Sequence, residues 1–88
     1  MSTEELKEGD LSMNKVRRQR LDEAIKLLEQ ARDIIEECKD EEEEYRDNIP
    51  ENLQSSDRYY NADNACDCLD SAYDGIDEII ENINEAQD

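Results

Sequence analysis

Two long runs of apolar residues, each spaced alternately by three and four positions, constrain the fold of this chain more than any other feature. Such spacing places side chains along one stripe of an α-helix and is typical of the seam between paired helices. The first seam consists of Leu21, Ala24, Leu28, Ala31, Ile35, Cys38, Glu42, Tyr45 and Ile49, and the second of Tyr59, Ala62, Cys66, Leu69, Tyr73, Ile76, Ile80 and Ile83. The sequence therefore predicts two helices that pack against each other.

The segment between the seams, NIPENLQSSD, carries the signals for a chain reversal. Pro50 disfavours helical backbone at the residue before it, and Ser55, Ser56 or Asp57 can cap a new helix. We also expect Leu53 to fold back and close the end of the core.

These signals predict an all-α fold, a two-helix antiparallel coiled-coil hairpin. We expect a helix at residues 12–47, a turn at 48–56 and a helix at 57–86, so that residues 12–88 form one acidic hairpin domain. Residues 1–11 are expected to fray or to form a short helix, because Ser2 and Glu5 fit a capping box.

Both predicted helices carry apolar residues outside their seams, with Leu27 and Ile34 on the first helix and Ile79 on the second. These residues widen the apolar stripe of each helix beyond what one partner helix covers, which suits a third or fourth helix. A homodimer that forms a four-helix bundle is the simplest way to cover the wider stripe. We therefore predict an oligomer interface at these three residues. Alternatively, the apolar stripe binds the helix of another protein, and the chain is a coiled-coil adaptor or scaffold.

Charge limits the possible partners. Twenty-seven acidic residues against ten basic ones give a net charge of −17, concentrated after residue 32. Such a surface repels nucleic acid and anionic lipid, and it attracts basic protein surfaces. No apolar run approaches the ~20 residues of a membrane span, and the amino terminus lacks the layout of a signal peptide. We expect a cytoplasmic protein that binds neither nucleic acid nor membranes directly.

Residue types needed for most catalysis are missing. The chain has no histidine, and its only glycines are Gly9 and Gly75. Carboxylates alone need a concave pocket to raise one pKa, which a thin hairpin does not supply. Residues 70–81 match part of a calcium-loop template, but the template positions held by Ala72 and Asp77 do not fit it, and the helical phase continues. We expect a protein that is not an enzyme, with no cofactor and no metal site.

Three cysteines give neither a disulfide framework nor the spacing of a zinc site. Cys38 and Cys66 are predicted to be small seam residues in a reducing compartment. Cys68 is two residues from Cys66, so it points to another face and is expected to be the more exposed thiol.

Acidic residues form continuous lines on both predicted helices at steps of three and four. Mixed charges would stabilise a solvated helix better than like charges do, so the unbalanced rows suggest a selected function. Carboxylates held on a rod can mimic the phosphates of a nucleic acid and occupy a groove built for DNA or RNA. The predicted partner-binding residues are Glu36, Glu37, Asp40, Glu41, Glu43, Glu44, Asp47, Asp63, Asp67, Asp70, Asp74, Asp77 and Glu81.

The run EEEEYRDNIPENLQSSDRYYNADNACDCLDSAYDGIDEIIENI resembles a group of small acidic helical proteins encoded by phages and integrated elements of Gram-positive bacteria. The shared features are an acidic helix end, a DN-x-P-E-x-L-Q turn and a second helix of the D-x-L-D-x-A type. Cys66 and Cys68 depart from that pattern. The resemblance implies origin on a mobile element and gives no residue a role.

Phage proteins of this size and charge include inhibitors of restriction and CRISPR nucleases. The leading hypothesis is therefore a non-enzymatic inhibitor, acting in the bacterial host cell, that presents its carboxylates as a nucleic-acid mimic. Its partner would be a basic DNA- or RNA-binding protein, such as a CRISPR or restriction nuclease. The adaptor described above is the alternative.

Overall fold

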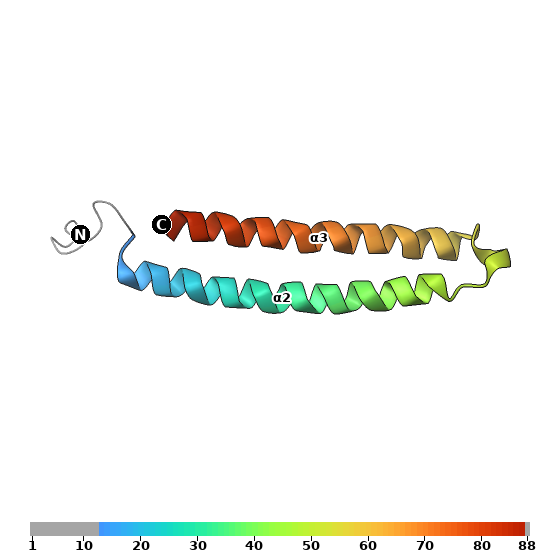
Figure 1. Cartoon of the computed structure of the whole chain (residues 1–88), viewed down its shortest axis with the longest axis horizontal. Helices are drawn as coiled ribbons and strands as arrows, with labels where there is room; N and C mark the ends of the chain where they lie inside the picture. The colour runs from blue at the N-terminus through green and yellow to red at the C-terminus, as the bar shows by residue number, and fades with distance from the viewer. Residues whose placement is uncertain (1–12, 88) are drawn as a thin grey trace.

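A computed structural model of the chain describes residues 13–87 and shows an antiparallel two-helix hairpin (Figure 1). Helix α2 spans Lys15–Asp47, a short 3-10 helix η1 spans Glu51–Leu53, and helix α3 spans Asp57–Gln87. The two long helices lie side by side along almost their full length and form a rod with a cross-section of 16 × 15 Å. The predicted fold class is confirmed, whereas the expectation for residues 1–11 lies outside the described residues.

Local signals account for the ends of the helices. The side chain of Asn14 accepts a hydrogen bond from the Arg17 backbone N–H at 2.8 Å, which caps the start of α2. At the other end, Asn48 ends α2 ahead of Pro50. The Ser56 hydroxyl accepts from the Tyr59 N–H at 3.4 Å, so Ser56 is the predicted serine that caps α3.

The core of the hairpin is thin. Within residues 13–87 the only side chains classed as buried are Ile49, Ala62, Cys66 and Ile80, with exposed fractions of 8% or less. Ile49 fills the end of the core next to the turn. Leu53, which the sequence placed there, is 40% exposed, so that expectation was wrong.

The predicted seam of α3 agrees with the structure, whereas the predicted seam of α2 agrees only in part. Ala24 and Ala31 are half-buried, as predicted. Cys38 and Tyr45 are exposed, whereas Arg32, Lys39 and Arg46 are partly buried against α3. The long aliphatic stems of these basic residues lie along the apolar surface while their charged ends reach out. The seam of α2 therefore alternates Leu21, Leu28, Ile35, Glu42 and Ile49 with Ile25, Arg32, Lys39 and Arg46.

Helix α3 continues without a break through residues 70–81, where the sequence partly matches a calcium loop. Among the described residues, no group of three or more potential ligands is placed to hold a metal ion. Neither helix of residues 13–87 has the length and apolarity needed to cross a membrane.

Candidate functional site

Three basic residues of α2 reach across the hairpin to three aspartates of α3 and form what we call the ion-pair ladder. Its pairs are Arg46–Asp63 with Nη1 to Oδ1 at 2.9 Å, Lys39–Asp70 with Nζ to Oδ1 at 3.6 Å, and Arg32–Asp77. The partners recur every seven residues on both helices, so consecutive pairs lie two helical turns apart. The ladder thus joins the helices along one side of the seam.

The basic members of the ladder are held by more than one contact. Arg46 Nε lies 3.0 Å from Asp47 Oδ1, and the Arg32 guanidinium lies 5.6 Å from the centre of the Tyr73 ring. The pKa of Arg46 is raised mainly by the hydrogen bonds to Asp47 and Asp63, and that of Arg32 by the hydrogen bond to Asp77. All of these interactions favour the charged form of the base.

Two groups make the hairpin sensitive to alkaline pH. Glu43 and Asp70 raise the pKa of Lys39 above its ordinary 10.5, and burial raises the pKa of the Cys66 thiol above its ordinary 9.0. A group with a raised pKa in the folded state adds stability that is complete below the unfolded pKa and is lost as pH rises. We predict that the free energy of unfolding, measured by urea titration under reducing conditions, falls as the pH rises above 9.

The variant Cys66→Ala separates the two contributions. It is expected to flatten the pH dependence just above 9.0 while leaving the decline above 10.5 that belongs to Lys39. A wild-type stability that increases from pH 9 upward would contradict the assignment of both groups.

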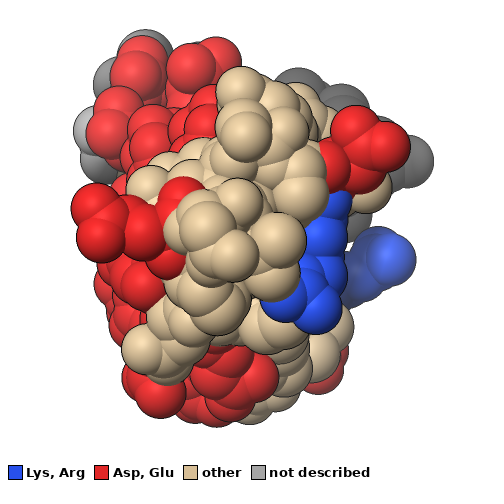
Figure 2. All heavy atoms as spheres, turned by 90° about the vertical axis from the view of Figure 1, so that its right-hand side faces the viewer, with Lys and Arg blue, Asp and Glu red and all other residues tan. Residues whose placement is uncertain are grey.

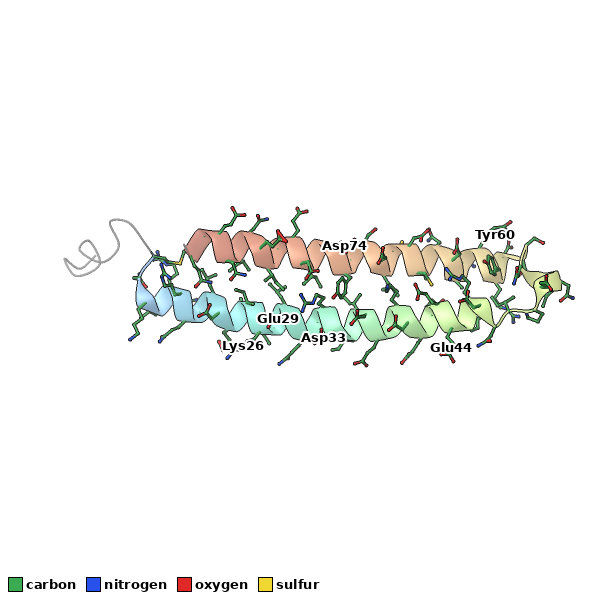
Figure 3. The ribbon with its side chains drawn as sticks, in the orientation of Figure 1. Lys26, Glu29, Asp33, Glu44, Tyr60 and Asp74 are labelled. Atoms are coloured by element: carbon green, nitrogen blue, oxygen red, sulfur yellow. The ribbon has the colours of Figure 1, made fainter. Side chains whose placement is uncertain are left out.

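The acidic side chains gather on the side of the hairpin that carries the ladder. Rows spaced by seven residues share one face of a helix, and the rows next to the ladder are almost entirely acidic. We call this surface the acidic flank. It consists of Asp22, Glu29, Asp33, Glu36, Asp40, Glu43 and Asp47 on α2, and of Asp63, Asp67, Asp70, Asp74, Asp77 and Glu81 on α3. Figure 3 labels Glu29, Asp33 and Asp74 among them.

The opposite side of the hairpin differs sharply in charge. Viewed from the end with the turn, acidic atoms cover the left-hand flank of the rod, and the basic atoms in view lie on the right (Figure 2). Acidic atoms also appear at the upper right and along the bottom, so the acids are concentrated on the left-hand flank without being confined to it.

Twelve of the thirteen predicted partner-binding residues lie on the acidic flank or, in the case of Glu37 and Glu44, at its outer edge. The exception is Glu41, which lies at intervals of seven residues from Leu27 and Ile34 and therefore shares their face of α2, on the opposite side of the hairpin. Sequence reasoning also left Asp22, Glu29 and Asp33 out of the site.

The ladder divides the six acidic-flank residues of α3 into two rows. Asp63, Asp70 and Asp77 are already paired with bases of α2. Asp67, Asp74 and Glu81 are exposed, and within residues 13–87 they form no ion pair; we call them the outer row. The outer row therefore keeps its full charge for an external partner. The spacing of Arg32, Lys39 and Arg46 was the sequence signal that could have predicted this division.

The fold and these surfaces define a class of protein, a two-helix hairpin with one strongly anionic flank. Comparison with family models, with curated proteins and with solved structures finds no match to this chain.

Proposed function

We propose that the chain is a non-enzymatic inhibitor that occupies the basic nucleic-acid-binding groove of a nuclease or another defence protein. The observation that carries this proposal is the concentration of acids on one flank of a straight rod, which holds 13 of the 22 acidic residues within residues 13–87, with the outer row unpaired. A surface that served solubility alone would gain from interspersed bases on every side.

The charge density of the rod fits such a mimic. Residues 13–87 carry 22 acidic and nine basic side chains along helices of about 50 Å, roughly one net negative charge per 4 Å. A single nucleic-acid strand carries one phosphate per ~3.4 Å of helix axis, and duplex DNA one per ~1.7 Å. The hairpin thus resembles one strand more closely than a duplex.

The test uses capture from a bacterial lysate, followed by competition with the purified partner. The partner is expected to be a nucleic-acid-binding protein whose complex with the chain is displaced by a single-stranded oligonucleotide and weakens steeply with salt, since ions are released from both charged surfaces. Where the partner is a nuclease, its cleavage of DNA is expected to be inhibited by the chain.

Neutralising the outer row with Asp67→Asn, Asp74→Asn and Glu81→Gln is predicted to weaken that complex by about tenfold or more. The matched control, Glu51→Gln, Glu78→Gln and Glu85→Gln, removes the same charge from exposed positions outside the acidic flank and is expected to bind almost normally. Equal loss in both variants, or a complex that oligonucleotides leave intact, would refute the proposal. Circular dichroism checks that both variants remain helical.

A further inference from the structure

The flank opposite the acids is apolar and exposed, and we call it the apolar flank. Leu27 and Ile34 are 61% and 60% exposed on α2, and Ile79 is 47% exposed on α3. The row next to Leu27 on α2 contains the small residues Ala24, Ala31 and Cys38, and the row of Ile79 on α3 contains Ala65, Ala72 and Ala86. Small residues allow the backbone of another helix to approach closely.

The described hairpin is a single layer of two helices with a thin core, and its apolar flank has no cover. A second helical layer on the apolar flank would supply the core that the single hairpin lacks.

Charge selects the side on which a second copy can approach. Two chains of net charge −17 repel each other across their acidic flanks. Between residues 13 and 87, the only acid in the rows of Leu27 and Ala31 is Glu41, and the same rows contain Arg17 and Arg20. Two copies therefore meet with least repulsion through this side.

One row of α2 is complementary to itself. At intervals of seven it reads Arg20, Leu27, Ile34 and Glu41, that is, a base, two apolar residues and an acid. An antiparallel twofold arrangement that places Leu27 against Ile34 of a second copy also places Arg20 against Glu41 of that copy, and each contact occurs twice. A parallel arrangement would instead oppose like charges.

We propose that the chain forms an antiparallel homodimer in which α2 packs against α2 of a second copy through this row. The result is a four-helix bundle with both acidic flanks facing outward. This inference does not depend on the proposed function, because it concerns the other side of the molecule.

The test measures the mass of the full chain under reducing conditions by analytical ultracentrifugation. The wild type is expected at twice 10.3 kDa. Glu41→Arg opposes two arginines across the twofold axis and is expected to raise the dimer dissociation constant about tenfold or more. The double variant Arg20→Glu/Glu41→Arg reverses both charges and is expected to restore the dimer.

The matched control is Glu44→Arg, which makes the same change of charge one turn away on an outward-facing row. It is expected to leave the dimer intact. A wild type that stays monomeric, including one that captures only a foreign helix, would overturn the proposal. So would a dimer indifferent to Glu41→Arg, or a double variant that remains monomeric while circular dichroism shows it to be folded.

Discussion

Reversing the three bases of the ion-pair ladder with Arg32→Glu, Lys39→Glu and Arg46→Glu is expected to unfold most of the hairpin. The change makes the net charge six units more negative than −17 and sets glutamates against the ladder aspartates. These glutamates also sit on the seam, where the stems of the original bases are partly buried. Far-UV circular dichroism at constant ionic strength measures the loss of helix.

Two further variants identify the cause of the unfolding. Reversing the aspartates as well, with Asp63→Lys, Asp70→Lys and Asp77→Lys, restores opposite charges in all three pairs and is expected to recover the helical signal. The variant Lys15→Glu/Lys26→Glu/Arg58→Glu makes the same change in net charge at exposed positions, and it is expected to stay largely folded. If it unfolds to the same extent as the ladder reversal, then net charge, and not the ladder, explains the result.

The ladder also defines the alignment of the helices. Apolar seams that repeat every seven residues would also match if one helix slid along the other by seven residues. After a slip of three or four residues, none of the ladder bases would face its aspartate. A slip of one heptad would still lose one pair of the three. Charge patterning of this kind is a known means of specifying orientation in coiled coils, and here it acts within a single chain.

The hairpin itself was predictable because its determinants are local. The three-and-four spacing of apolar residues, Pro50 and a serine cap each act over a few residues, and their agreement leaves few alternative folds. The exposure of Cys68 also followed from the phase of the second seam.

The error in the seam of α2 has a physical reason. Residue class alone favoured Cys38 and Tyr45 over Lys39 and Arg46, since cysteine and tyrosine are the more apolar. Which row faces α3 was decided by long-range pairing with Asp63 and Asp70, whose positions relative to α2 are known only once the helices are aligned. Long basic side chains with an acid within reach can take seam positions, and periodicity in apolar residues does not reveal this.

For the candidate site, too, the features set by local sequence signals were predictable, and those set by long-range contacts were not. The acidic rows were visible in the sequence because steps of three and four place residues on one helix face. Which acids remain unpaired was not visible, because this depends on contacts between residues 17 to 45 positions apart, as in Arg46–Asp63 and Arg32–Asp77. The outer row emerges only from the folded chain, which pairs three of the six candidate residues on α3 and leaves Asp67, Asp74 and Glu81 with an uncompensated charge.

Truncating Ile80 to alanine is expected to reduce the free energy of unfolding by about 2–4 kcal/mol, because Ile80 is 8% exposed and its loss leaves a cavity in a thin core. For a domain of this size such a change lowers the melting temperature by roughly 10–25 °C. A loss of about 2–4 kcal/mol is a large share of the ~5 kcal/mol stability expected of a small domain.

The adjacent Ile79→Ala is the matched control, since it removes the same atoms from a side chain that is 47% exposed. At protein concentrations low enough to keep the chain monomeric, it is expected to reduce the free energy of unfolding by less than about 1 kcal/mol. Thermal melts followed by circular dichroism compare the two variants. Equal destabilisation would mean that Ile79 is as buried as Ile80 within one hairpin, which contradicts the assignment of the apolar flank. A loss for Ile79→Ala that grows with protein concentration would instead place Ile79 in contact with a second copy.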